Sequence, residues 1–472
     1  MAPIPDQATP PCPDCGEPRS HRWGAEHGSQ RYRCRSCRKT FTPHSGTAAA
    51  RLRHKDKWQI YSDATHDGLG VRLTAAECNV APSTVQRWRH RLDAAILARE
   101  APPPVSGLIS FFSGVGGLDL GFERAGFRAL LANEVSHQFA DGYEHARAGL
   151  GIPMPKLGLV RDTAESFLQA RRDELCAAMR EARRAYQMVG FIGGPPCPDF
   201  SIAGKNIGST GKHGRMTQVY VDLIVSHQPD YFIFENVPGL YTTKHHREFY
   251  DVIKGQLGAN GFALTDKLVH ALEYGVPQRR IRLFLFGFRR ESFPAADVMA
   301  GEFPWAAHAR YSDADDASWP KTVPFSEGGQ RRWPSKLPTR FRVLTAGHWF
   351  VRNKVEGHPN GSERFMPRSG LHHMQTVAEG DTGRKSFKRL HRYRYSPTLC
   401  YGHNEVHLHP NEARRLTVAE ALALQSFPPE FSLPSTLSLS SKFRAVSNAV
   451  PYRLAYGLAL ALADTLTTAQ RR

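Results

Sequence analysis

A cysteine between prolines is the first residue whose type and position indicate chemistry. In "GGPPCPDFS", residues 193–201, Cys197 follows two prolines at the end of the apolar run "MVGFIGG". Proline fixes its own φ and restricts the residue before it, so this loop should hold the thiol nearly rigid. A rigidly placed thiol suits covalent catalysis as a nucleophile. On this stretch alone, the alternative is a turn that contains a buried, inert cysteine.

Four further cysteines have the spacing of metal ligands. "CPDC" and "CRSC" place Cys12, Cys15, Cys34 and Cys37 in two C-x2-C pairs separated by 18 residues. Each pair can present two thiolates to one tetrahedral ion, which is the pattern of a zinc ribbon. Four thiolates leave no open coordination position, so we expect a structural Zn²⁺ whose binding stabilises the fold.

A glycine-rich turn and two acidic residues indicate a nucleoside-bearing cofactor. "GLISFFSGVGGLDLGFERAGF", residues 107–127, runs from an apolar strand through Gly114 and Gly116 into a helical pattern. These glycines permit positive φ and close approach of the backbone to a ligand. Glu134 ends the next apolar strand, where a carboxylate can accept from both hydroxyls of a ribose, and Asp162 follows in "LVRDT". An ordinary tight turn is the alternative for the glycines alone.

A glutamate and two arginines are expected to share a pocket. The apolar strand "PDYFIFENVPGL" ends in Glu235, and "EYGVPQRRIRLFLFGF" brings Arg280 and Arg282 into another strand. Period-2 alternation places both guanidinium groups on one face. Because buried charges are costly without partners, a common pocket is favoured over isolated surface charges.

The order of these motifs resembles the DNA cytosine carbon-5 methyltransferases. F-S-G-x-G-G, P-P-C, E-N-V and Q-R-R-x-R are followed by "RRLTVAEALALQSFP" and "SNAVPYRLAYGLAL", so the resemblance spans about residues 107–468. It implies a doubly wound α/β fold with a mostly parallel sheet, of the Rossmann-like class I type that uses S-adenosyl-L-methionine. It also implies that Phe112, Gly114, Gly116, Glu134, Asp162 and Asn448 bind this cofactor.

The resemblance assigns catalytic roles as well. Cys197 would add to carbon 6 of a flipped-out cytosine, and the resulting enamine-like ring can accept a methyl group at carbon 5. Glu235 would engage ring nitrogen 3, and Arg280 and Arg282 would flank the base and its carbonyl. Two positions depart from the family pattern. Pro198 stands where glutamine is usual, which affects contacts near the DNA backbone, and Ser110 stands where an acid is usual, which affects cofactor-site geometry.

A basic segment is expected to recognise DNA. Residues 331–394 contain 15 basic and 4 acidic residues, and "KRLHRYRYSPTL" interleaves Arg392 and Arg394 with tyrosine. By position the segment resembles the family's target-recognition domain, so we expect it to be irregular, rich in β-structure and in contact with DNA phosphates. His407 and His409 lack an evident acidic partner, and the adjacent His372 and His373 should face apart on a strand, so we assign no metal to these histidines.

The first hundred residues are expected to contain a second nucleic-acid-binding element. In "LTAAECNVAPSTVQRWRHRL", Pro82 fits the first position of a helix in which Val85, Trp88 and Leu92 form the buried face. Arg87 and Arg89 would lie on the outer face and could enter a major groove, although an idle basic face is the alternative. "RYRCRSCRKTF" followed by this helical pair resembles the front end of insertion-sequence transposases.

The composition indicates the kind of partner and the cell compartment. The 472 residues carry 62 Lys plus Arg against 44 Asp plus Glu, and this net charge of +18 suits a polyanion such as double-stranded DNA. The cysteine pattern and the lack of a long apolar run or signal-like start predict a reduced, cytoplasmic protein that is associated with the nucleoid and not with a membrane.

We therefore predict six segments: a zinc ribbon (1–45), a helix-turn-helix (46–100), a linker (101–107), a catalytic domain (108–289), a target-recognition domain (290–412) and a return to the catalytic domain (413–472). The expected function is sequence-specific DNA cytosine carbon-5 methylation of restriction-modification, phage or mobile-element type, with a restriction endonuclease as a possible partner. A transfer-RNA cytosine methylase and a DNA-binding regulator with an idle catalytic domain are the alternatives.

Overall fold

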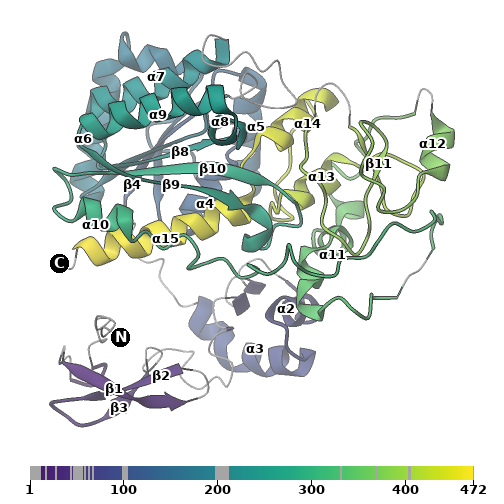
Figure 1. Cartoon of the computed structure of the whole chain (residues 1–472), viewed down its shortest axis with the longest axis horizontal. Coiled ribbons are helices and arrows are strands. Elements are labelled where there is room, and N and C mark those ends of the chain that lie inside the picture. The colour runs from purple at the N-terminus through teal and green to yellow at the C-terminus, as the bar shows by residue number, and fades with distance from the viewer. Residues whose placement is uncertain are drawn as a thin grey trace. The chain divides into compact units, whose positions relative to one another are not determined.

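The computed structural model describes residues 12–15, 17, 19–26, 29–42, 45, 57, 60–61, 64–65, 69–97, 105–196, 212–329, 332–367, 370–401 and 405–470. The chain divides into two compact units, Met1–Glu100 and Ala101–Arg472, and each is described by itself (Figure 1). Within the described ranges, no helix has the length and apolar character needed to cross a membrane.

The larger unit is built on a seven-stranded, mostly parallel sheet. The strand order is β6-β5-β4-β7-β8-β10-β9, with all neighbours parallel except β10, which is antiparallel to both β8 and β9. The strands are β4 (Gly107–Phe111), β5 (Arg128–Asn133), β6 (Leu159–Val160), β7 (Val189–Gly193), β8 (Tyr231–Asn236), β9 (Phe262–His270) and β10 (Ile281–Arg289). The doubly wound, mostly parallel sheet expected from the sequence is confirmed.

Helices cover both faces of this sheet. The helices of this part of the chain are α4 (Gly117–Arg124), α5 (His137–Gly149), α6 (Arg172–Tyr186), α7 (Lys212–His227), α8 (Gly239–Thr242), α9 (Lys244–Ala259), α10 (Ala296–Gly301), α13 (Val418–Leu424), α14 (Leu439–Asn448) and α15 (Tyr452–Gln470), with short 3-10 turns at Ala164–Leu168 and Ala271–Tyr274. Of these, α13 and α14 belong to a separate hydrophobic cluster that contains no residue of the sheet strands. Figure 1 shows α6, α7 and α9 over one face and α4, α10 and α15 over the other.

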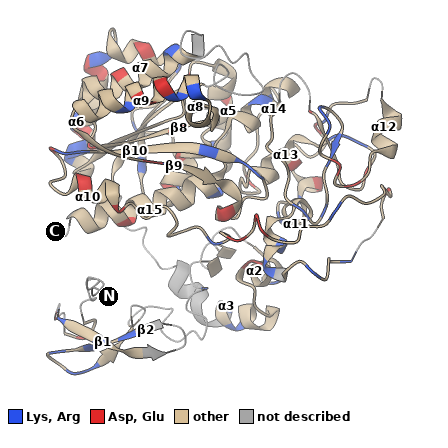
Figure 2. Cartoon of the chain, viewed as in Figure 1, with Lys and Arg blue, Asp and Glu red and all other residues tan. Residues whose placement is uncertain are grey.

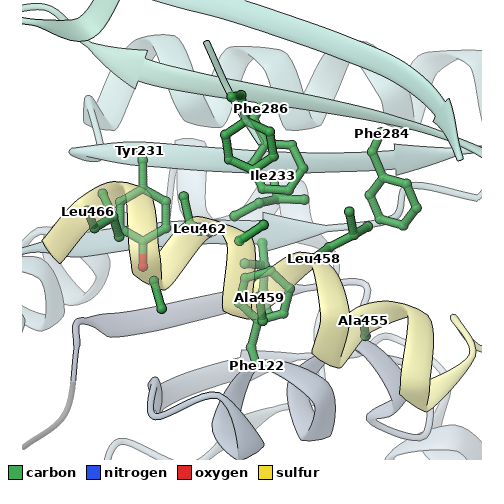
Figure 3. Close-up of a cluster of buried hydrophobic side chains, with 14 of the residues drawn as sticks. Phe122, Tyr231, Ile233, Phe284, Phe286, Ala455, Leu458, Ala459, Leu462 and Leu466 are labelled. Carbon is green, nitrogen blue, oxygen red and sulfur yellow. The ribbon is translucent and has the colours of Figure 1, made fainter. Parts of the chain in front are cut away.

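Alternation along the strands supplies two hydrophobic cores. On β8, Ile233 packs with α15, whereas its neighbours Phe232 and Phe234 pack with α6, α7 and α9. Figure 3 shows the first of these cores, in which Ile233, Phe284 and Phe286 face Leu458 and Leu462 of α15. Because α15 is the end of the chain, the last segment completes the sheet's second layer.

The segment between α10 and α13 is irregular. Its described elements are 3-10 turns at Thr339–Leu344 and Val355–Gly357, α11 (Ala346–Arg352), α12 (Leu371–Thr376), and the two-residue strands β11 (Lys388–Arg389) and β12 (His407–Leu408). The expectation of a β-rich domain is therefore wrong. His372 and His373 lie on helix α12 and not on a strand, which corrects a second expectation.

The buried side chain of Arg389 helps to hold this irregular segment together. The guanidinium of Arg389 is fully buried and donates to the carbonyls of Val377 (2.7 Å), His409 (2.6 Å) and Glu412 (2.9 Å). These bonds satisfy loop carbonyls that a sheet would otherwise pair. Lys and Arg recur along this part of the chain (Figure 2).

The smaller unit contains a β-ribbon and a helical pair. Strands β1 (Ser20–Glu26), β2 (Ser29–Cys34) and β3 (Thr40–Phe41) form an antiparallel sheet in the order β1-β2-β3. Helix α2 (Val71–Cys78) is followed by a three-residue turn and α3 (Pro82–Leu97), so Pro82 is the first residue of its helix, as predicted. Val85 and Trp88 are buried as expected, whereas the side chain of Leu92 lies outside the described residues.

Candidate active site

The carboxyl ends of β4, β5 and β6 bring the predicted cofactor residues together. After β4 the backbone turns sharply, with φ of 55° at Phe112, 57° at Gly114 and 86° at Gly116. A non-glycine residue in this region is strained by about 1–2 kcal/mol, and Phe112 is held there with its ring edge-on to Tyr220. The turn delivers the chain into the first residue of α4.

Glu134 is fixed at the end of β5. Its carboxylate accepts from the N–H groups of Gly114 (2.8 Å) and Ser136 (2.8 Å). Burial raises the pKa of Glu134, and the two N–H bonds oppose that rise. The neighbouring Val135 is 56% exposed, so an apolar side chain lies open to solvent beside the carboxylate.

Asp162 lies at the end of β6 with a more exposed carboxylate. It accepts from the N–H of Thr163 (2.7 Å) and from Arg171 Nε (3.3 Å), and the first of these contacts is the main cause of its lowered pKa. The side chain of Asn133 donates to the carbonyls of Val160 (3.1 Å) and Asp162 (2.7 Å). The strand ends that carry Glu134 and Asp162 are therefore linked directly.

The motif "SNAVPYRLAYGLAL" near the end of the sequence packs against the turn that follows β4. A Cβ on Gly117 would lie 2.5 Å from the carbonyl oxygen of Val450, so only glycine permits this close packing. Asn448, the last residue of α14, is exposed. The structure thus places the residues that follow Asn448 against the start of α4.

Glu235 and Arg282 form a buried ion pair at the adjoining edge of the sheet. Arg282 Nε lies 3.3 Å from Glu235 Oε1, and each side chain is 11% exposed. Burial raises the pKa of Glu235, and the positive charges of Arg282 and Arg280 oppose that rise. A Cβ on Gly194 would lie 2.8 Å from Glu235 Oε2, so a larger residue just after β7 would displace the Glu235 carboxylate. Cys197 and Pro198 lie outside the described residues.

Arg280 has different contacts from Arg282, and it lies just before β10, which begins at Ile281. Its Nη2 donates to the carbonyls of Ser447 (2.9 Å) and Ala449 (3.2 Å), and its Nη1 donates to that of Leu399 (3.4 Å). The side chain is 1% exposed. Arg280 therefore holds backbone carbonyls on either side of Asn448.

Gln278 and Gln425, which are not among the predicted site residues, link the chain before β10, the loop at Leu399 and the end of the chain near Val446. Gln278 Nε2 donates to Leu424 O (3.2 Å) and Gln425 Oε1 (3.1 Å), and its Oε1 accepts from Leu399 N–H (3.1 Å). Gln425 Nε2 in turn donates to Val446 O (2.6 Å). The only sequence signal was a glutamine inside each of the motifs "PQRRIR" and "ALALQSF".

Asp119 explains the serine found where the family has an acid. The Ser110 hydroxyl donates to Asp119 Oδ1 (2.7 Å), and the Tyr143 hydroxyl donates to Asp119 Oδ2 (2.9 Å). Burial raises the pKa of Asp119 to about 6. A carboxyl group from α4 thus lies within hydrogen-bond reach of the end of β4, where an acid on the strand was expected.

The four cysteines of the smaller unit converge. Their Sγ atoms all lie within 4.8 Å of one another, with 3.6 Å between Cys12 and Cys37 and 3.6 Å between Cys15 and Cys34. Thiolates at about 2.3 Å from a tetrahedral Zn²⁺ are about 3.8 Å apart, so the residues fit this ion. Among the described residues no other group of three or more potential ligands gathers in this way.

His407 and His409 do have acidic partners, contrary to our expectation. His407 Nδ1 lies 2.7 Å from Glu405 Oε1, and His409 Nδ1 lies 3.3 Å from Glu412 Oε1. Both histidines are buried. Their contacts are pairs within the fold and do not assemble into a metal-binding group.

The residues predicted to touch DNA differ in their surroundings. Arg87 on α3 is exposed, whereas Arg89 donates to the carbonyl of Leu69. Arg392 is bound by the buried carboxylate of Glu379 through Nε (2.8 Å) and Nη2 (3.0 Å). Arg394 is half-buried, with its guanidinium 5.2 Å from the centre of the Tyr395 ring.

The strand order, with one antiparallel strand between β8 and β9, and the polar residues at the strand ends define a class I methyltransferase fold. A crystal structure of a DNA modification methyltransferase encoded within an Escherichia coli prophage shares this fold, with a TM-score of 0.53 and 22% identity over 77% of this chain and 99% of that chain. The chain belongs to the C-5 cytosine-specific DNA methylases, whose family model matches residues 107–463. It is a DNA cytosine carbon-5 methyltransferase.

Two relatives show how far the similarity extends. Type II methyltransferase M.NmeDI of Neisseria meningitidis serogroup C is 47% identical over 401 residues, which are 85% of this chain and 90% of that protein. Type II methyltransferase M.FnuDI of Fusobacterium nucleatum is 28% identical over 371 residues, or 77% of this chain and 96% of that protein. Since only 366 residues lie between Gly107 and Arg472, the similarity to the Neisseria protein extends into the smaller unit.

Proposed function

We propose that the chain is a sequence-specific modification enzyme of a type II restriction-modification system. The designation of both relatives as type II methyltransferases supports this, and it implies a restriction endonuclease that cuts the same DNA sequence. The observation that carries the proposed chemistry is the buried Glu235–Arg282 pair, which lies beside the glycine that leads into the Cys197 loop.

Phe112, Gly114, Gly116, Glu134, Asp162 and Asn448 would hold S-adenosyl-L-methionine. The carboxylates of Glu134 and Asp162 can accept hydrogen bonds from hydroxyl and amino groups, and the exposed Val135 beside them offers apolar contact to an adenine ring. When bound, this cofactor supplies an electrophilic methyl group. The turn after β4 contributes backbone groups that a Cβ would otherwise obstruct.

The residues of the ion pair would activate the flipped-out base. Cys197 adds as a thiolate to carbon 6, and a protonated Glu235 donates to ring nitrogen 3 as negative charge develops there. Arg282 holds the Glu235 carboxyl in place and, from the same position, can donate to the carbonyl of the base. After carbon 5 is methylated and loses its proton, the bond between carbon 6 and Cys197 Sγ breaks and the thiolate leaves.

Arg280 would act on this site through the backbone. Because its guanidinium lies against the carbonyls of Leu399, Ser447 and Ala449, it positions the Asn448 turn relative to the strand that carries Arg282. We therefore assign base contact to Arg282 and positioning to Arg280.

The recognition segment would read the bases that flank the target. Its charge of +11 over residues 331–394 suits phosphate contact. In the smaller unit, a structural Zn²⁺ on the four cysteines and helix α3 with the exposed Arg87 would form an additional duplex-binding element.

Bisulfite sequencing of plasmid DNA from cells that express the protein tests the proposal. We expect methylated cytosines at one recurring sequence, and none when Cys197→Ser is expressed at the same level. Methyl transfer to transfer RNA in preference to DNA would contradict it. Binding to DNA without methylation of any sequence would instead favour the regulator with an idle catalytic domain.

A further inference from the structure

The β-ribbon of the smaller unit has two different faces. Tyr32 of β2 pairs with Phe41 of β3, and their stacked rings pack with Cys12 and Cys34. Alternation places Arg31 and Arg33 on the opposite face, where Arg33 pairs with both His21 and Thr40. One face therefore supports the cysteine cluster, and the other is available for a different role.

Trp23 is the unusual residue of this second face. It is 47% exposed, and among the large apolar side chains that are exposed in the described part of the chain it is the only aromatic one. The guanidinium of Arg33 lies 4.4 Å from the centre of the indole, and the ring of His21 meets it nearly edge-on at 5.6 Å. Arg33 Nε also donates to the carbonyl of Arg38 (3.1 Å), so the stacked pair is anchored.

The strand and turn beside this pair are strongly basic. Residues 29–39 contain five basic residues and no acidic residue. Trp23 is the one large exposed apolar side chain of the described ribbon, so the face offers a single ring and no extended apolar patch. An aromatic ring beside guanidinium groups is, however, the combination that binds a polynucleotide strand, because the ring stacks on a base while the cations contact phosphates.

We propose that His21, Trp23, Arg31 and Arg33 form a binding surface for single-stranded DNA. In a duplex the faces of the bases are already stacked, so an exposed indole can reach them only where a strand is unpaired. Helix α3 would bind duplex DNA, so the two parts of the smaller unit would recognise different forms of the same polymer. This surface needs neither methyl transfer nor the residues of the catalytic site.

Binding of a fluorescently labelled deoxyoligonucleotide of about 20 nucleotides to the full chain, followed by anisotropy, tests the surface. We expect Trp23→Ala to weaken binding about 5- to 100-fold, the usual loss for one stacked base. Trp23→Phe should retain most of the affinity, because the phenyl ring can still stack. Trp23→Ala should bind one Zn²⁺ through the four cysteines as the wild type does, which shows that the ribbon is folded.

Two controls separate stacking from charge. On an abasic strand of equal length the wild type and Trp23→Ala should bind equally, because no base is present to stack. Arg22 pairs with Tyr32 on the cysteine face and is exposed, so Arg22→Ala removes the same charge as Arg33→Ala from the opposite side. Only Arg33→Ala should lower the salt dependence of binding.

Three results would overturn the proposal. They are an unchanged affinity of Trp23→Ala, an equal loss of affinity in Arg22→Ala and Arg33→Ala, and a loss of affinity in Trp23→Ala that is as large on the abasic strand as on the normal strand. Tighter binding to an RNA strand of the same sequence would overturn the assignment to DNA. Loss of methyl transfer in Cys197→Ser with normal strand binding would leave this inference intact.

Discussion

Arg282 Nε lies 3.3 Å from Oε1 of Glu235, and this pair joins the end of β8 to the start of β10 beside Gly194, which follows β7. Both side chains are nearly buried, so neither charge is screened well by solvent. Burial shifts the pKa of Glu235 upward even with Arg282 beside it. The carboxyl can therefore carry a proton at a higher pH than an exposed glutamate.

Replacing Glu235 with glutamine should lower methyl transfer by about two to four orders of magnitude, the usual weight of a positioned acid or base. In the wild type, single-turnover transfer should decline as pH rises through the raised pKa, because the proton needed at ring nitrogen 3 is lost. The glutamine variant should lack this decline. DNA affinity and its salt dependence should stay unchanged, and a change confined to them would contradict the assignment.

Changing Arg280 to alanine should affect stability and cofactor binding, whereas changing Arg282 to alanine should affect the rate of methyl transfer. Arg280→Ala leaves carbonyls of Leu399, Ser447 and Ala449 without their donor, so we expect a loss of about 3 kcal/mol in unfolding free energy and weaker cofactor binding. Arg282→Ala should chiefly lower the rate of transfer in bound complexes. Calorimetric unfolding and cofactor titration distinguish the two. Equal effects of both variants on both measurements would refute the division.

Asp119→Asn should change the pH dependence of stability. The pKa of Asp119 is about 6 in the fold against 3.8 when unperturbed, so the native state holds a proton between these values that the unfolded chain has lost. Unfolding free energy therefore falls as pH rises through this window, by roughly 3 kcal/mol from this group. The asparagine variant should lack that fall. The exposed Asp316→Asn is the matched control and should follow the wild-type curve.

Replacing Arg392 should affect the stability of the fold, whereas replacing Arg394 should affect binding to DNA. Arg392→Ala would leave the buried carboxylate of Glu379 without its main partner, so we expect the recognition segment to lose about 3–5 kcal/mol of stability. Arg394→Ala should leave stability unchanged and reduce the log–log salt slope of DNA binding by about one unit. Unfolding curves and binding at several salt concentrations measure both. The reverse pattern would show that Arg392 is the phosphate contact.

Removal of Zn²⁺ by a chelator, or Cys34→Ser, should unfold residues 12–42 and leave the larger unit able to bind its cofactor. The reason is that the cysteine cluster and the ribbon core lie within the smaller unit. Limited proteolysis and cofactor titration report the two outcomes. A fragment that begins at Val105 should bind the cofactor as well as the full chain does, and loss of that binding would show that the units depend on each other.

The sequence by itself determined the features that depend on short-range geometry. The C-x2-C spacing predicted the convergence of Cys12, Cys15, Cys34 and Cys37, because two intervening residues suffice to present both thiolates. Proline's missing N–H placed Pro82 at the start of α3. The cost of burying unpaired charges predicted a common pocket for Glu235 and Arg282, and the order of motifs indicated the family.

Only the tertiary structure decided which partner each polar group meets. Alternation treats Arg280 and Arg282 alike, yet Arg280 meets carbonyls near residue 448 while Arg282 meets Glu235. Ser110 binds the carboxylate of Asp119 from another element, and the segment between α10 and α13, where we expected strands, is held by buried side chains such as Arg389. Periodicity specifies the face of an element on which a side chain lies. The opposing group comes from a segment distant in the chain, and the packing of the whole unit brings it there.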